Sequence, residues 1–257
     1  MEFIDELKFL KEQLKFKEKI DGAHKFNEIV LAGMGGSGIA GKIFQEIYTE
    51  KPFFVVDDYN IPNRALAEGE IDANFFQHKP FLEQQINQFN YDICPLTEVH
   101  IEPMGIYSLN GSLNSLESGG LVTIPNDPSN ETRALLLLEK AGLISLSKDS
   151  SSLTLKNIKE NPYGLKFKEI DSAFLTRTLD EVEASVIPTN YALLFELNPI
   201  EDSLFLEDNT SLYANIIVVQ KKDLLKPELL CLKKHMESEK MSLYINSTYK
   251  GALVPIH

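Results

Sequence analysis

The chain has 257 residues and carries 38 acidic against 25 basic side chains, which gives a formal net charge of −13. This charge disfavours nucleic acid and anionic membrane surfaces as partners, because both would repel the chain. Cys94 and Cys231 are its two cysteines, which is too few for a disulfide framework or a thiolate metal cluster. The composition therefore predicts an acidic globular protein without a metal or other cofactor.

The spacing of apolar residues predicts alternating helices and strands. Helices are expected over residues 3–20, 39–50, 62–69, 130–141 and within 226–250. Strands are expected at residues 28–32, 53–56, 71–76, 99–106, 122–125, 184–187 and 216–219. Such alternation favours an α/β protein with mainly parallel sheets.

The most distinctive motif is the glycine-rich segment LAGMGGSGIAGK at residues 31–42, between an expected strand and an expected helix. Gly33, Gly35 and Gly38 satisfy the dinucleotide fingerprint, and Asp57 ends the next strand near where a ribose-binding acid belongs. The phosphate loop of nucleoside triphosphatases is excluded, because Ile43 stands where a hydroxyl residue would hold magnesium. A dinucleotide-binding enzyme thus stays open, beside a purely structural turn.

The segments IVLAGMGGSGIAGK and PFFVVDDYNIPN resemble the start of the sugar isomerase domain of bifunctional phosphoglucose/phosphomannose isomerases. This resemblance covers residues 1–63 and implies a phosphosugar-binding or isomerase-like protein. Its anion loop would consist of Gly35, Gly36, Ser37 and Gly38. The later phosphate-binding and catalytic regions of that family have no counterpart in this chain, so we expect no isomerase activity.

A longer resemblance begins at Ala65. The segments ALAEGEIDANFFQHKPFL, VHIEPMGIYS, TIPNDPSNETRALLLLEKAGLI, NYALLFELNP, DSLFLEDNTSLYANIIVV and YKGALVPIH are similar to the NlpA/MetQ family, the methionine-binding proteins of ABC importers. This resemblance implies a two-lobed periplasmic-binding-protein fold that captures methionine or a close analogue, without catalysis. The implied partner is the membrane subunit of an importer. The turn Tyr59-x-x-Pro62-Asn63 is similar to turns in both families, so we interpret the chain as a possible chimera joined there.

The resemblance also predicts how the chain divides. Residues 1–26 form an N-terminal amphipathic helix, residues 27–103 with 213–257 form lobe 1, and residues 104–212 form lobe 2. The first strand, loop, helix and strand of lobe 1 are isomerase-like. The family is exported and membrane-anchored, but the first 20 residues are dense in Lys and Glu and have no apolar signal-peptide core. We therefore expect the chain, as written, to be cytoplasmic.

A buried amino-acid zwitterion needs a cation for its carboxylate, polar partners for its ammonium group and an apolar slot for its side chain. Arg133, at the start of the leucine-rich helix, is expected to pair with the carboxylate, as its match to the family's arginine also implies. Asn190 and Asn215 follow or end buried strands and match the family's ligand asparagines. Each could instead satisfy a backbone turn.

Aromatic side chains supply the expected slot for a thioether, namely Tyr59, Phe75, Phe76, His78 and His100. If residues 71–76 form a strand, Phe75 and Phe76 point to opposite faces and only one of them meets the ligand. The two histidines lack acidic neighbours at a spacing that would suggest a metal site. Glu102 is either an acceptor for the ammonium group or a structural residue beside Pro103.

Overall fold

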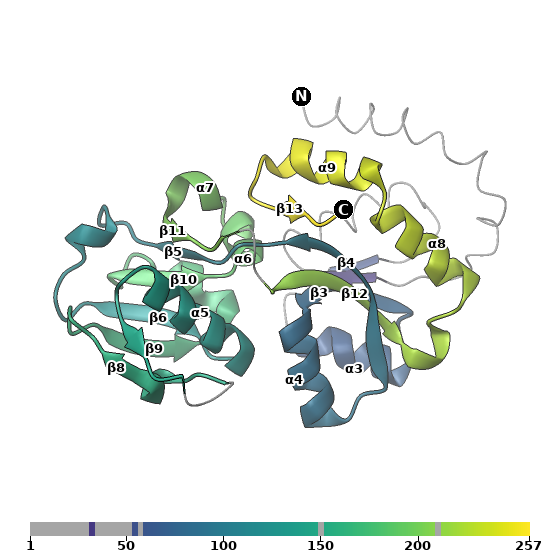
Figure 1. The fold of residues 1–257 in the computed structure, drawn as a ribbon, viewed down its shortest axis with the longest axis horizontal. Helices are drawn as coiled ribbons and strands as arrows, with labels where there is room; N and C mark the ends of the chain where they lie inside the picture. The colour runs from purple at the N-terminus through teal and green to yellow at the C-terminus, as the bar shows by residue number, and fades with distance from the viewer. Residues whose placement is uncertain (1–30, 34–52, 56–58, 149–151, 209–211) are drawn as a thin grey trace.

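The computed structural model describes residues 31–33, 53–55, 59–148, 152–208 and 212–257. Two lobes lie side by side, each built around one β-sheet with helices packed on it (Figure 1). This two-lobed α/β architecture is the one predicted. The helices expected at 3–20 and 39–50 and the glycine loop lie outside the described residues. Within the described ranges, no helix is long and apolar enough to cross a membrane.

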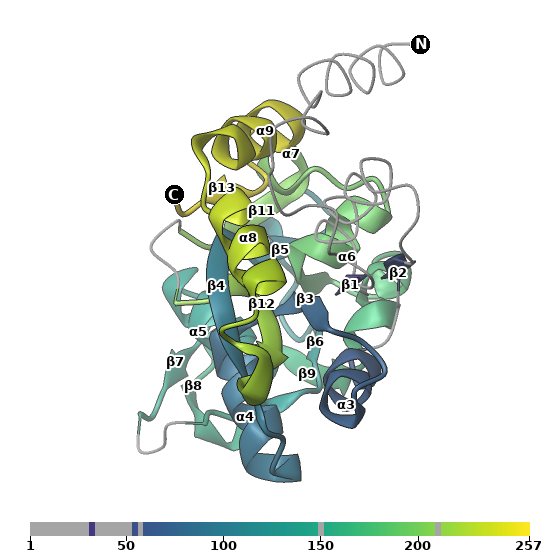
Figure 2. The ribbon, with the colours of Figure 1, turned by 90° about the vertical axis from the view of Figure 1, so that its right-hand side faces the viewer.

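Lobe 1 contains a six-stranded sheet in the order β13-β4-β12-β3-β1-β2. Its strands are β1 (Leu31–Gly33), β2 (Phe53–Val55), β3 (Ala73–His78), β4 (Ile93–Ile101), β12 (Ala214–Gln220) and β13 (Val254–Pro255). Among the described residues, the helices that pack on it are α3 (Ile61–Glu68), α4 (Lys79–Phe89), α8 (Pro227–Met236) and α9 (Glu239–Tyr249). Figure 2 shows α8 lying over β4 and β12.

The apolar run in β12 explains why both faces of this sheet are covered. Side chains alternate along a strand, so neighbouring residues face opposite sides. Ile216 and Val218 pack in the core beneath α3 and α4, whereas Ile217 and Val219 pack beneath α8 and α9. All four are fully buried. A strand that is covered on both faces is apolar throughout rather than at alternate positions.

Lobe 2 contains a five-stranded sheet in the order β11-β5-β10-β6-β9 and a two-stranded sheet of β7 and β8. Its strands are β5 (Gly105–Tyr107), β6 (Leu121–Pro125), β7 (Ser145–Leu146), β8 (Ile158–Glu160), β9 (Lys166–Ile170), β10 (Ala184–Ile187) and β11 (Ser203–Leu206). Its α-helices are α5 (Pro128–Lys140), α6 (Thr189–Leu194) and α7 (Pro199–Asp202). Short 3-10 helices are η3 (Leu113–Ser115), η4 (Leu155–Asn157) and η5 (Ser172–Thr178), with η6 (Lys221–Asp223) in lobe 1.

Helix α5 carries several candidate site residues, and its ends follow from its sequence. The Asp127 side chain caps the first turn by accepting a hydrogen bond from the main-chain N–H of Asn130 at 2.9 Å. Pro128 occupies the first turn, where its missing N–H costs nothing. Gly142 follows the last turn with a φ of +75°, a left-handed conformation that favours glycine. The helix predicted to end at Gly142 is confirmed.

The six-stranded and five-stranded sheets are both mixed, so the expectation of mainly parallel sheets is corrected. Parallel pairing is confined to β2-β1-β3 and β10-β6-β9, and the other neighbouring strands run antiparallel. The chain leaves lobe 1 through β4 and returns through β12, so these adjacent strands must run in opposite directions. The same holds for β5 and β11 in lobe 2.

The chain crosses between the sheets twice, from β4 to β5 and from β11 to β12. The single strand expected at 99–106 is therefore two strands in different sheets, since β4 ends at Ile101 and β5 begins at Gly105. We retain residues 27–103 with 213–257 and residues 104–212 as the proposed limits of the two lobes.

Candidate functional site

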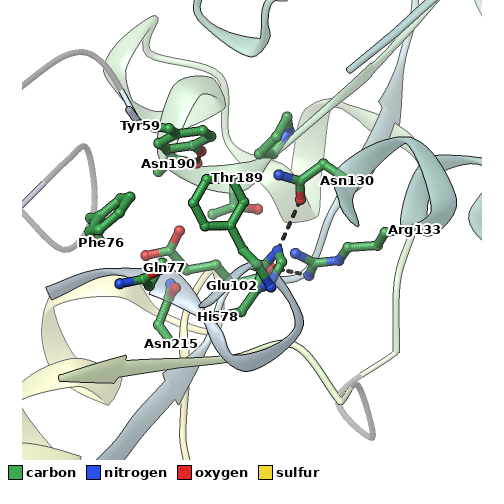
Figure 3. A pocket seen from close by; sticks show the side chains of 12 residues that line it. Tyr59, Phe76, Gln77, His78, Glu102, Asn130, Arg133, Thr189, Asn190 and Asn215 are labelled. Atoms are coloured by element: carbon green, nitrogen blue, oxygen red, sulfur yellow. Dashed lines mark hydrogen bonds between the residues drawn. The ribbon is translucent and has the colours of Figure 1, made fainter. Parts of the chain in front are cut away.

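A cavity lies where the two lobes meet beside the crossing strands (Figure 3). It encloses about 360 Å³ of empty space, part of which is open to solvent. Lobe 1 contributes Tyr59, Phe76, Gln77, His78, Phe81, Glu102 and Asn215 to its lining. Lobe 2 contributes Asn130, Arg133, Pro188, Thr189 and Asn190. Residues from both lobes therefore surround one cavity.

Most of the side chains expected at the site lie in this lining, namely Tyr59, Phe76, His78, Arg133, Asn190 and Asn215. Phe75 does not, because it faces the other side of β3 and packs in the core under α8 and α9. His100 also lies behind the lining. The proposed anion loop of Gly35, Gly36, Ser37 and Gly38 lies outside the described residues.

His100 lies behind the cavity lining and contacts Glu102, which lines the cavity. Its ring meets the Phe75 ring edge-on, with centroids 5.3 Å apart. His100 Nε2 lies 2.8 Å from Glu102 Oε1 and 3.5 Å from Asn215 Nδ2. Both His100 and Glu102 are buried. His100 thus orients a carboxylate that lines the cavity, instead of touching the cavity itself.

Aromatic rings form one wall of the cavity. The Tyr59 ring lies 5.9 Å from that of Phe76 and 5.7 Å from that of Phe81, between centroids. Across the lobe boundary, the Tyr59 and Tyr191 rings lie 5.4 Å apart. Burial raises the pKa of Tyr59 well above its usual value, so its hydroxyl remains protonated. This wall suits an uncharged, flexible side chain such as a thioether.

Arg133 is held by three groups around the crossing strands. Its Nε lies 3.1 Å from Glu207 Oε2, and its Nη2 donates to the Glu102 main-chain carbonyl at 2.7 Å. Its guanidinium lies over the Tyr213 ring at 4.4 Å. Glu207 in turn accepts a hydrogen bond from the Met104 N–H at 3.1 Å. These contacts use Nε and Nη2 and fix a buried cation at the cavity wall.

Asn190 lies in the first turn of α6, just beyond β10, where its amide reaches the cavity. Its Oδ1 accepts a hydrogen bond from the Tyr59 hydroxyl at 3.0 Å, which joins the lobes. Its Nδ2 is buried and has no hydrogen-bond partner among the described residues. A buried donor without a partner costs about 1–3 kcal/mol, so this nitrogen is poised to receive an acceptor from a ligand.

Gln77 lines the cavity but directs its amide into the protein. The Asn63 and Gln77 amides bond to each other twice, at 2.8 and 2.6 Å. Asn74 joins them by donating to Asn63 Oδ1 at 3.0 Å and accepting from Gln77 Nε2 at 2.9 Å. All three residues are buried. This amide cluster ties α3, which follows Tyr59, to β3.

Sequence reasoning did not select Gln77, Phe81, Asn130, Pro188 or Thr189. Two of them carried a usable signal, because Phe81 lies one helical turn after His78 and Asn130 lies three residues after the capping Asp127. The Thr189 hydroxyl bonds to the Pro103 carbonyl, a contact between residues far apart in the chain. In the part of the chain that the structure describes, no group of three or more His, Cys, Asp and Glu is placed to hold a metal ion.

Comparison with known proteins identifies close relatives. The family model for NlpA lipoproteins matches residues 40–257. "Outer membrane lipoprotein 3" from Mannheimia haemolytica is 39% identical over 219 residues, which is 84% of this chain and 83% of the relative. The "D-methionine-binding lipoprotein MetQ" of Escherichia coli K12 is 39% identical over 209 residues, which is 79% of this chain and 77% of the relative.

Solved structures are similar over nearly the whole chain. A nutrient binding protein from Burkholderia cenocepacia, solved bound to methionine, has a TM-score of 0.84 and 38% sequence identity. The similarity covers 90% of this chain and 99% of that protein. The crystal structure of the methionine binding protein MetQ gives a TM-score of 0.82 at 33% identity, with coverage of 89% and 98%.

The predicted cytoplasmic location is wrong. The matching family consists of lipoproteins, and one relative is named an outer membrane lipoprotein, which points to an exported protein. The prediction failed because it depended on finding no export signal in the first residues, whereas the export of a protein is not decided by its folded domain.

Proposed function

The chain belongs to the NlpA lipoprotein family, and from this premise we propose that it captures methionine or a close analogue for an ABC importer. Relatives named D-methionine-binding lipoproteins and a related structure bound to methionine support this ligand. The observation that carries the proposal is Asn190 Nδ2, which within the described residues is buried at the cavity without a partner. We propose binding without catalysis, and an importer membrane subunit as the partner.

The charged groups of the cavity suit the two ends of an amino acid. We assign the ligand carboxylate to Nη1 of Arg133, the guanidinium nitrogen that the Glu207 and Glu102 contacts do not use. We assign the ammonium group to the Glu102 carboxylate, which His100 orients from behind. Asn190 and Asn215 then supply amide partners between the two charges.

The ligand's thioether would lie against the aromatic wall of Tyr59, Phe76 and Phe81. Contacts between sulfur and aromatic rings contribute about 0.3–1.5 kcal/mol each. A branched or charged side chain would lose these contacts or require a partner that an aromatic wall does not offer. The site thus favours a long, flexible, uncharged side chain.

The isomerase-like segment at residues 1–63, and the chimera with it, stay a prediction without support from the comparisons. The family model begins at residue 40, inside that segment. As an alternative function, a phosphosugar would bind at Gly35, Gly36, Ser37 and Gly38 rather than in the cavity between the lobes.

Thermal unfolding with candidate ligands tests the proposal. A ligand at 100 times its Kd stabilises the folded state by about 2.7 kcal/mol. We expect L- or D-methionine to raise the unfolding temperature, and fructose 6-phosphate and NAD to leave it unchanged. A shift with fructose 6-phosphate but not with methionine would contradict the proposal and favour the alternative.

A further inference from the structure

The imidazole of His78 uses both of its nitrogens inside the protein. Its Nδ1 accepts a hydrogen bond from the Phe81 main-chain N–H at 3.2 Å and so caps α4. An accepting ring nitrogen carries no hydrogen, so the neutral ring must carry its hydrogen on Nε2. Nε2 lies 3.0 Å from Asn130 Oδ1, to which it therefore donates.

Asn130 is oriented by the capping residue of its own helix. Its main-chain N–H and its Nδ2 donate to the two carboxylate oxygens of Asp127, each at 2.9 Å. Because Nδ2 faces Asp127, Oδ1 must face His78, as the dashed line in Figure 3 shows. A chain of three side chains thus connects the N-terminus of α5 in lobe 2 to that of α4 in lobe 1.

The surroundings of His78 favour its neutral form. Burial, then the nearby Arg133 cation, lower the pKa of His78 to about 3. The Tyr213 and Phe81 rings meet the imidazole edge-on at 5.0 and 6.2 Å. Glu102 lines the same cavity, and Asp127 acts on the ring through Asn130. Protonation would also remove the Nδ1 lone pair that caps α4.

We propose that Asn130 is a positioning residue that acts through His78: it holds the neutral Nε2–H tautomer, and the resulting bond fastens the two lobes over the ligand. The inference rests on the proposed function for the identity of the ligand. His78 belongs to lobe 1 and Asn130 to lobe 2, so the hydrogen bond between them requires the closed arrangement of the lobes. When the lobes separate, His78 regains water and leaves the Arg133 cation, so its proton affinity rises toward the ordinary value, although its Nδ1 still caps α4. Closure in acid then requires the protonated ring to release one proton to solvent.

This linkage predicts that the affinity of the protein for methionine depends on pH, although methionine itself does not titrate in the same pH range. With the ordinary His pKa of about 6.5 as the upper limit in the open form, the methionine Kd rises by up to about tenfold between pH 7.5 and pH 5.5. His78→Phe keeps a ring in the wall but removes the titrating group. Its Kd should therefore change by less than about twofold over the same interval.

A double-mutant cycle measured by calorimetry tests the coupling. Asn130→Ala and His78→Phe should each weaken methionine binding by about tenfold, which is the loss of one hydrogen bond across the lobes. The double variant should bind about as weakly as either single variant, because both remove the same bond. Asn198→Ala removes an amide cap from α7, away from the cavity, and serves as the control with unchanged Kd.

Nitrogen-15 spectra of His78 in the unmutated chain saturated with methionine give an independent measurement if a variant does not fold. A neutral ring with its hydrogen on Nε2 at pH 6 supports the inference, and a charged ring or an Nδ1–H tautomer overturns it. The inference is also overturned if the affinity losses of Asn130→Ala and His78→Phe multiply in the double variant and the Kd of the unmutated chain does not depend on pH. In that case, methionine binding by the unmutated chain still upholds the proposed function. If the unmutated chain does not bind methionine, the proposed function fails. Normal methionine binding with a charged ring or an Nδ1–H tautomer leaves the proposed function standing and overturns the inference alone.

Discussion

Replacing Asn190 with leucine should weaken ligand binding while leaving the free protein nearly as stable. The side chains have similar shape, but leucine lacks both the Oδ1 that accepts from Tyr59 and the buried, unpartnered Nδ2. Loss of the hydrogen bond costs about 0.5–1.5 kcal/mol, and loss of an unpaired buried donor regains a similar amount. We therefore expect the free energy of unfolding in urea to change by less than about 1 kcal/mol.

The complex should respond differently, because there Nδ2 bonds to the ligand. A hydrogen bond to a charged group contributes about 1.5–3 kcal/mol, so calorimetry on Asn190→Leu should show the methionine Kd raised roughly 10- to 150-fold. Tyr59→Phe is the matched control, since it removes the same bond between the lobes but keeps Nδ2. Asn190→Leu binding within twofold of the unmutated chain would refute the reasoning. Equal losses in the two variants would assign the effect to the Tyr59 bond instead.

Three further measurements examine the buried polar groups. Arg133→Ala should weaken the free energy of methionine binding by about 2–5 kcal/mol, and Arg133→Lys should not restore binding in calorimetry, because one ammonium cannot replace the planar set of donors. Between pH 6.5 and about 3 the unfolded chain protonates His78 and the folded chain does not, so the unfolding free energy falls with falling pH by about 1.4 kcal/mol per unit. Burial and Glu169 raise the pKa of Glu131 to about 7, which acts in the opposite direction, so the pH slope is measured against His78→Phe. Asn74→Leu should lower the unfolding free energy in urea by about 1–3 kcal/mol, because it leaves the Gln77 amide short of a partner.

Local chemistry made much of the chain predictable. The IIVV run of β12 required a strand buried on both faces, and the Asp127, Pro128 and Gly142 signals set the ends of α5. Residue type and family resemblance also selected Arg133 and Asn190, which line the cavity. These features depend on short stretches, within which period, capping and side-chain chemistry act directly.

Sequence alone misjudged two kinds of feature: the relative direction of neighbouring strands, and which side chains line the cavity rather than support its lining. The sheets were expected to be mainly parallel, yet the chain leaves lobe 1 by β4 and returns beside it by β12, which makes that pair antiparallel. His100 was expected to touch the ligand, but it lies behind Glu102. No local pattern distinguishes an aromatic side chain that lines a cavity from one that supports its lining.

What the sequence by itself determined was therefore several of the described elements, the family and the kinds of side chain at the site. The tertiary structure decided which groups are already paired. Arg133 meets Glu207, 74 residues away, and His78 meets Asn130, 52 residues away, while Asn190 Nδ2, among the described residues, meets none. The His78–Asn130 pairing arises only when the two lobes close, because each partner is fixed by a different lobe. In both pairings, neither residue carries a mark of its partner in its own stretch of chain.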